Sequence, residues 1–175
     1  GAGPPLLELL LRLVDTSGQV VGPAQFLSAA ERYRLMPAID RWVVGEAARS
    51  IARLSRDVPG CCFAINLSGQ SMADLELRDL ILELIDRHGL DGSRLLFEVT
   101  ETAAISSLQT AAAFIDSVQR AGCRFVLDDF GSGLSSFRYL RHLKVSYLKI
   151  DGELVRGIAT DPTQREMVAA IQRIG

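Results

Sequence analysis

The stretch Phe125-Val-Leu-Asp128-Asp129-Phe-Gly131-Ser-Gly133 decides how the rest of the chain is interpreted. Its apolar start is typical of a strand covered on both faces of a parallel sheet, and this strand is predicted to end in the two carboxylates. Gly131 and Gly133 allow backbone angles that other residues avoid, so a sharp turn is expected just past the acids. Adjacent carboxylates repel each other, and a divalent cation is their usual partner at such a strand end. The alternative is that Asp128 caps the next helix while Asp129 faces water.

The composition is that of one ordinary globular domain. The chain has 175 residues, of which 48% are hydrophobic and 23% charged, and its formal net charge is -2. This charge offers no basic field for nucleic acid, and no apolar run approaches the ~20 residues that cross a bilayer. The cysteines Cys61, Cys62 and Cys123 fit reduced, buried thiols better than disulfides. We therefore expect a cytoplasmic protein, or the cytoplasmic part of a membrane-anchored one, with no zinc site and no nucleic-acid partner.

Strand-like and helix-like segments alternate along the chain. Residues 1–5 show no pattern and are interpreted as a linker or an expression remnant. Five apolar runs are strand candidates: 6–14, 61–67, 94–100, 124–128 and 145–150. Helical spacing and capping residues predict helices at 23–33, 37–54, 73–88, 107–121, 134–143 and from Pro162 to the end. Trp42 recurs in the helical stripe of 37–54 and is interpreted as a core residue.

This alternation predicts an α/β fold with a parallel sheet and helices packed outside it. The sheet could be open and doubly wound, or closed into a barrel. Polar residues stand at or near the ends of four different strands: Asn66, Glu98, Asp128 and Lys149. A doubly wound sheet concentrates its ligand at one switch point, whereas a (β/α)8 barrel presents residues from many strand ends at one face. We therefore favour a TIM-like (β/α)8 barrel.

The predicted face carries oxygen donors and one lysine: Glu8, Asn66, Glu98, Asp128, Asp129 and Lys149. Hard oxygen ligands without histidine or thiolate select magnesium, manganese or calcium. Paired hard metals suit the in-line hydrolysis of a phosphodiester, with Lys149 holding an anionic substrate or positioning a water. The guanidinium of Arg12 could clamp a phosphate. The residues therefore predict metal-assisted phosphodiester hydrolysis.

Each of these residues also has a purely structural interpretation. Glu8 could be a surface residue on an edge strand, and Asn66-Leu-Ser68 could be a turn with helix-capping groups. Glu98 and Glu101 could only cap the following segment. Lys149 could form a structural ion pair with Asp151 or with Glu98. The shared position at strand ends favours the joint functional interpretation.

Several motifs together resemble those of the EAL domain family. They are Glu8-Leu9-Leu10-Leu-Arg12, Asn66-Leu-Ser68, Glu98-Val-Thr-Glu101, Asp128-Asp-Phe-Gly-Ser-Gly133 and Leu148-Lys149-Ile-Asp151, in the family's order. The resemblance implies a modified (β/α)8 barrel and a bacterial phosphodiesterase that linearises cyclic di-GMP to pGpG with Mg²⁺ or Mn²⁺. It implies that Glu8, Asn66, Glu98 and Asp128 hold one ion and that Asp128 and Asp129 serve a second.

The resemblance also implies roles for the remaining site residues. Lys149 and Glu8 would act in catalysis, and Arg12 and Asp151 would contact the substrate. A loop that couples the site to homodimerisation would include Gly131, Ser132 and Gly133, steadied by Glu101. Sensory or GGDEF domains are expected as partners in the same protein.

The chain departs from the family pattern in three respects. Its signature triplet is Glu8-Leu9-Leu10, with leucine in place of the central alanine. A Gln-Pro-Ile-type strand before Glu8 and a Val-Ala-Glu-Gly-type strand after residue 175 are absent from it. Residues 6–175 are therefore expected to be a partial EAL domain of about five strands that lacks the first strand and the C-terminal part. The alternatives to an enzyme are a non-catalytic cyclic di-GMP sensor and a regulatory interaction domain.

Overall fold

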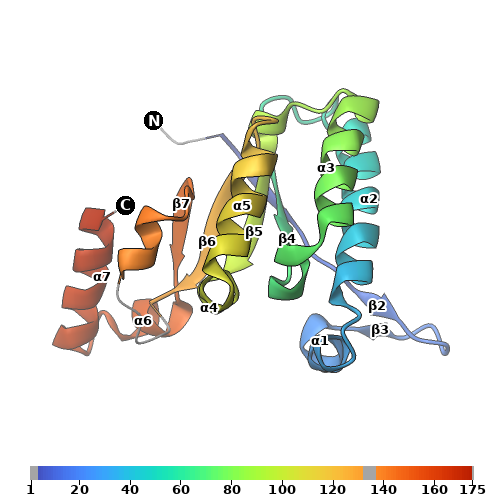
Figure 1. The fold of residues 1–175 in the computed structure, drawn as a ribbon. Coiled ribbons are helices and arrows are strands. Elements are labelled where there is room, and N and C mark those ends of the chain that lie inside the picture. Colours follow the sequence, from blue (N-terminus) through green and yellow to red (C-terminus); the bar gives the residue numbers. More distant parts are fainter. Residues whose placement is uncertain (1–3, 132–136, 175) are drawn as a thin grey trace.

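The structure, a computed structural model, describes residues 4–131 and 137–174. Five strands form one parallel sheet in the order β1-β4-β5-β6-β7 (Figure 1). Within this sheet, each strand lies beside the sheet strand that follows it along the chain. The strands are β1 Leu6–Leu9, β4 Cys62–Asn66, β5 Leu95–Thr100, β6 Arg124–Phe130 and β7 Tyr147–Ile150. A doubly wound sheet reverses its strand order at a switch point and carries helices on both faces. This sheet does neither, and it has the order and layering of an arc of a barrel.

The helices follow the sequence predictions where the periodic segments are long. They are α1 Pro23–Arg32, α2 Met36–Leu54, α3 Leu75–His88, α4 Glu101–Ser106, α5 Leu108–Gln119, α6 Gly152–Gly157 and α7 Pro162–Ile174. The Asp74 carboxylate starts α3 by accepting from the backbone of Glu76 and Leu77, and Gly89 ends it in the left-handed conformation at φ 59°. Neither α4 nor α6 was predicted, because six residues are too few to show a helical period.

Three short 3₁₀ turns also occur, η1 Gly69–Ala73, η2 Gly92–Arg94 and η3 Phe137–Arg141. The last of these replaces the end of the helix predicted over 134–143, whose first residues lie outside the described part of the chain. A hairpin of β2 Leu13–Val14 and β3 Val20–Val21 was missed as well. Its strands are too short to show alternation, and the single strand predicted over 6–14 is divided between β1 and β2. A turn joins β2 to β3. The Asp15 carboxylate accepts there from the backbone of Ser17 at 2.8 Å and of Gln19 at 2.9 Å.

The core lies between the sheet and the helices α2, α3 and α5. Alternate residues of each strand point into it, among them Phe63, Phe97 and Phe125, which are at most 1% exposed. The rings of Phe97 and Phe125 lie 5.6 Å apart. Among the described residues, the opposite face of the sheet holds a second and smaller apolar cluster: Cys62, Ala64, Leu96 and Val126. We call the first face the outer face and the second the inner face.

The cysteine prediction is confirmed. Cys61, Cys62 and Cys123 are all free and buried. Burial raises the pKa of the Cys123 thiol to about 12, so it stays protonated at neutral pH. In the described ranges no helix is both long and apolar enough to cross a membrane.

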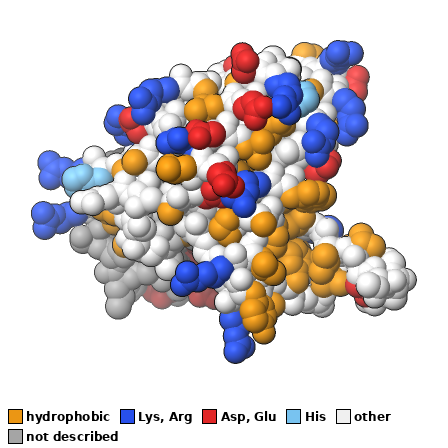
Figure 2. Space-filling view, turned by 45° about the vertical axis from the view of Figure 1, so that its right-hand side comes forward, with side chains coloured by type: hydrophobic (Ala, Val, Ile, Leu, Met, Phe, Trp, Pro, Cys, Tyr) orange, Lys and Arg blue, Asp and Glu red, His pale blue; other side chains and the backbone are white. Residues whose placement is uncertain are grey.

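The prediction that Trp42 is a core residue is wrong, since its side chain is 58% exposed. The buried stripe of α2 runs through Asp40, Val44 and Ala47. Trp42 lies two residues from the first two of these, about 200° around the helix, and therefore faces away from the sheet. It lines a groove of about 630 Å³ with Leu13 and Leu35, in a region of exposed apolar side chains (Figure 2).

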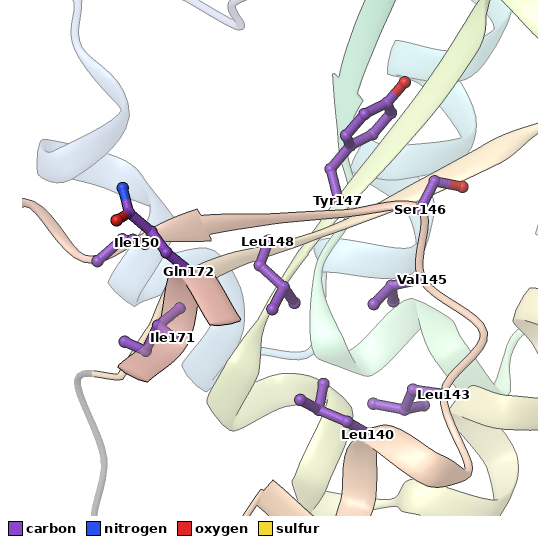
Figure 3. A pocket seen from close by; sticks show the side chains of 9 residues that line it. All are labelled: Leu140, Leu143, Val145, Ser146, Tyr147, Leu148, Ile150, Ile171 and Gln172. Atoms are coloured by element: carbon purple, nitrogen blue, oxygen red, sulfur yellow. The ribbon is translucent and has the colours of Figure 1, made fainter. Parts of the chain in front are cut away.

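A second groove, of about 430 Å³, lies beside β7 (Figure 3). Leu140, Leu143 and Leu148 point toward one another there, while Tyr147 points to the other side of the strand. This groove belongs to the outer side of the sheet, and it carries none of the predicted site residues.

Candidate active site

The predicted site residues come one from each strand of the sheet and share its inner face. Each precedes or follows a residue that packs in the outer core, so the two-residue period of a strand places it on the opposite side. The five residues are Glu8, Asn66, Glu98, Asp128 and Lys149. Parallel strands end at the same edge, and this face is therefore where the sequence predicted the side chains to meet.

Asn66 links the first two of these strands. Its amide Nδ2 donates to Glu8 Oε1 at 2.9 Å, and in the strand register Asn66 lies directly beside Glu98. Glu8 is exposed on an edge strand of the described sheet, as its structural interpretation supposed, yet it is held by this hydrogen bond. The amide oxygen of Asn66 takes no part in that hydrogen bond, so it can serve as a metal ligand.

Lys149 lies between two carboxylates. Its Nζ is 2.6 Å from Glu98 Oε2 and 3.6 Å from Asp128 Oδ2. The structural alternative of a Lys149–Glu98 pair is thus confirmed as a contact, whereas Asp151 instead caps α6 by accepting from the Glu153 backbone at 2.7 Å. The side chain of Glu98 is 1% exposed and that of Lys149 is 40% exposed, so the pair joins the buried interior to the open face.

The pair has shifted proton affinities. Burial is the largest cause that raises the pKa of Glu98; together with the charges of Glu8 and Asp128 it outweighs the hydrogen bond and charge of Lys149, which lower it. Burial by itself would lower the pKa of Lys149, but the hydrogen bond and charge of Glu98, with Asp128 and Glu8, outweigh it and the pKa is raised. Lys149 is therefore a firmly protonated donor at neutral pH.

The Asp128-Asp129 pair lies within a bulge of β6. The strand was predicted to end at these acids, but it continues to Phe130, and its register against β7 shifts between Leu127 and Phe130. The extra residue lets Phe130 pack in the outer core together with Leu127, which simple alternation would not permit. Both carboxylates thereby stay outside the core.

Asp129 has an unusual backbone, with φ 53° in the left-handed region. Its N–H donates to Asp128 Oδ1 at 3.0 Å, and its own side chain is exposed. Partial burial, followed by the charges of Asp128 and Asp151, raises the pKa of Asp129. A positive charge brought to this point would relieve the repulsion among the three carboxylates.

The donor chemistry suits a hard cation, while the arrangement shown does not yet form a cage. Glu8, Glu98 and Asp128 offer carboxylate oxygens, and Asn66 an amide oxygen, as Mg²⁺ or Mn²⁺ prefer. Among residues 4–131 and 137–174, no three acidic, histidine or cysteine side chains converge on one point. The ammonium of Lys149 instead balances Glu98 and Asp128. The residues fit the metal chemically. Metal binding would require Lys149 to give up part of its contact with Glu98 and Asp128.

Glu101 lies beside the inner-face residues rather than among them. Its side chain is buried, accepts from the Gly131 backbone at 2.8 Å and binds the Tyr139 hydroxyl. The cap of α4 is supplied by Thr100, so Glu101 is not itself the cap. Sequence reasoning missed Tyr139, whose pKa is raised by burial and by the Glu101 carboxylate. Ser132 and Gly133 lie outside the described residues.

Arg12 lies apart from the carboxylates. It follows β1, is exposed, donates to the Leu11 carbonyl at 2.8 Å and lines the groove that contains Trp42. Asp40 was missed as a polar residue of interest, although a carboxylate in the apolar stripe of 37–54 is a visible signal. It is 3% exposed and accepts from Ser68 and Ser71, just past Asn66.

Comparison with known proteins agrees with this geometry. PdeB of Shewanella oneidensis, a cyclic di-GMP phosphodiesterase, is 36% identical over 168 residues, which are 96% of this chain and 20% of PdeB. MucR of Pseudomonas aeruginosa, a bifunctional diguanylate cyclase/cyclic di-GMP phosphodiesterase, is 35% identical over 176 residues, 99% of this chain and 26% of MucR. The chain thus spans only a fifth to a quarter of these relatives.

The FimX EAL domain of Xanthomonas citri, solved in complex with c-diGMP, has a TM-score of 0.88 and 31% identity, over 96% of this chain and 66% of that one. EAL domains are TIM barrels, so the predicted barrel fold is confirmed, with this chain supplying five of its strands. The EAL domain family itself matches residues 4–175. On the shared motifs, the shared fold and this match, the chain belongs to the EAL domain family.

Proposed function

We propose that this chain carries the larger part of the active site of a metal-dependent phosphodiesterase that hydrolyses cyclic di-GMP to pGpG. The observation that carries the proposal is the convergence of five polar side chains, one from each parallel strand, on one face of the sheet. The cyclic di-GMP phosphodiesterases among its relatives, and the ligand of the FimX EAL domain, support cyclic di-GMP as the proposed substrate.

The side chains divide into three roles in this proposal. Glu8, Asn66, Glu98 and Asp128 would hold one Mg²⁺ or Mn²⁺ ion, and Asp128 with Asp129 a second. Bound metal would polarise the phosphodiester and make a water more acidic. Lys149 would keep its proton on Nζ and orient the attacking water, while Glu98 holds the ammonium in place.

Substrate contacts and partners complete the proposal. Arg12 and Asp151 would contact the substrate, and Glu101 would hold Gly131 behind the two aspartates. A homodimer and further sensory or GGDEF domains in the same protein remain part of the proposal. MucR, a relative named as a bifunctional diguanylate cyclase/cyclic di-GMP phosphodiesterase, supports the expectation of further domains.

Replacing Asp128 with Asn tests the enzyme directly. The full-length protein is incubated with cyclic di-GMP and Mn²⁺, and pGpG is quantified. We expect the wild type to form pGpG and Asp128→Asn to lose roughly 100-fold or more in rate, because an amide is a poorer ligand and carries no charge. Lys144→Met is the control. Lys144 is an exposed lysine that pairs with Asp116, and its replacement should leave the rate unchanged. Unchanged metal-dependent hydrolysis in Asp128→Asn would contradict the proposal.

One observation favours a second candidate, a cyclic di-GMP sensor that does not hydrolyse its ligand. Lys149 bridges Glu98 and Asp128, where an acidic cage would be needed for metal. The same incubation separates the two functions. Tight binding of cyclic di-GMP without pGpG supports the sensor, and neither binding nor product supports a regulatory interaction domain.

A further inference from the structure

The turn that follows Asn66 is held from both sides. On the sheet side, the Leu67 N–H donates to the Glu98 carbonyl at 2.8 Å and continues the β4–β5 ladder. On the helix side, the Ser68 N–H leaves the sheet and donates to Asp40 Oδ2 of α2 at 2.8 Å. The backbone two residues beyond the Asn66 side chain is therefore set by a carboxylate of a helix.

Asp40 collects a second donor at the same atom. The Ser71 hydroxyl donates to Asp40 Oδ2 at 2.6 Å, and the hydroxyls of Ser71 and Ser68 lie 3.0 Å apart. Ser71 is fully buried and Asp40 nearly so. A buried carboxylate is costly unless its hydrogen bonds are made, so this network has one well-defined arrangement.

Neighbouring contacts leave the turn little room to relax. A Cβ added to Gly69 would lie 2.8 Å from the Ala103 Cβ of α4, so the backbone there packs directly on that helix. At the other end of η1, Arg41 pairs with Asp74 at 2.6 Å. Adjacent residues of α2 thus hold both ends of the segment 68–74.

We propose that Asp40 is a positioning residue of the active site, which orients the Asn66 amide toward Glu8 and the metal by fixing the turn at Ser68. The inference rests on the proposed function because it assumes a bound metal. The hydrogen bond from Asn66 to Glu8, however, can be followed without metal. Asp40 lies behind the sheet, in the outer core layer, and touches neither substrate nor metal ligand in this role.

Three variants of the full-length protein test the inference. Asp40→Ala removes the acceptor, whereas Asp40→Asn keeps one oxygen that can accept from both serines. Val44→Ala, one turn further along the same buried stripe, is the control for a general loss of packing. We expect Asp40→Ala to weaken Mn²⁺ binding about 10- to 100-fold, as outer partners of metal ligands do, and Asp40→Asn to stay within about threefold of wild type. Val44→Ala should lower the unfolding midpoint and leave Mn²⁺ affinity unchanged.

Two measurements make this test independent of the hydrolytic activity. Mn²⁺ binding is measured by titration calorimetry, and the Asn66 side-chain amide is followed by ¹⁵N NMR without metal. Asp40→Ala should move the Asn66 side-chain resonances, and Val44→Ala should not. If wild type binds no Mn²⁺, the proposed function fails and the NMR comparison still decides the role of Asp40. Wild-type Asn66 resonances in Asp40→Ala, or equal changes in Val44→Ala, would overturn the inference.

Discussion

The two faces of the sheet are built from the same strands and have opposite chemistry. The outer face is a continuous apolar core, in which residues such as Phe63, Phe97 and Phe125 interlock with three helices. The inner face has a buried cluster of four small or medium apolar residues, and its charged residues include Glu98, Lys149, Asp128 and Glu8. The strand period alone separates the two sets, since neighbours in sequence point to opposite sides. We infer that the outer face supplies the stability which allows the inner face to keep unfavourable charges close together.

The β6 bulge shows how the two faces interact. The outer face requires Phe130 in the core, and the inner side requires two carboxylates at the sheet edge. An ordinary strand cannot satisfy both, because Asp129 would point into the core. The inserted residue and its left-handed backbone resolve this conflict at a cost of order 1–3 kcal/mol, which the surrounding packing has to offset.

The largest effect is expected from a substitution in the outer face. Phe97→Ala removes a ring that is 1% exposed and should lower the free energy of unfolding by about 3–5 kcal/mol. The measurement is urea denaturation followed by circular dichroism. A loss below about 1 kcal/mol would show that the outer face does not carry the stability. Any protein that remains folded should keep the proposed affinity for Mn²⁺, because Phe97 points away from the site.

A smaller effect is expected from the inner face, and its pH dependence lies in the alkaline range. Lys149 has a raised pKa, so the folded protein holds this proton more tightly than the unfolded chain. The stabilisation is complete below the ordinary value of 10.5 and is lost as the pH rises through the higher folded value. Lys149→Met should therefore lose less stability than wild type above that pH.

The size of this difference is about 1 kcal/mol or less, because the Lys149 side chain is 40% exposed and water screens its charge. Unfolding free energies measured from pH 8 to pH 12, with Lys144→Met as the control, provide the check. Parallel pH profiles for Lys149→Met and wild type would show that Glu98, Asp128 and Glu8 do not stabilise the ammonium.

The smallest effect is expected where neither face is involved. Arg87 and Glu83 form an ion pair on the exposed surface of α3, with both side chains more than half exposed. Arg87→Ala should change the free energy of unfolding by only about 0.3–0.5 kcal/mol, because solvent screens such pairs. The same urea titration measures it. A loss above 1 kcal/mol would mean that surface charges contribute to stability on the scale of the core.

The long elements were predictable because each shows its period in the chain. The stripe of α3, with its Asp74 cap and its Gly89 end, is visible in the sequence, as are the apolar strands. The hairpin β2–β3 and the helices α4 and α6 were not, because so few residues show no period. Trp42 was misplaced because a stripe read from sequence is wide, and only packing shows which edge of it is covered.

For the site, sequence alone determined the proposed inventory, oxygen donors and a lysine on successive parallel strands; in the sheet, Asn66 lies beside Glu98 and Lys149 lies in β7. Tertiary structure alone decided the partners. It paired Lys149 with Glu98, placed Asp128 and Asp129 in a bulge, and tied the Asn66 turn to Asp40. The physical reason is the distance along the sequence over which each property acts. Strand alternation is a local property of the chain, whereas these contacts join residues 28 and 51 positions apart and depend on how the layers pack.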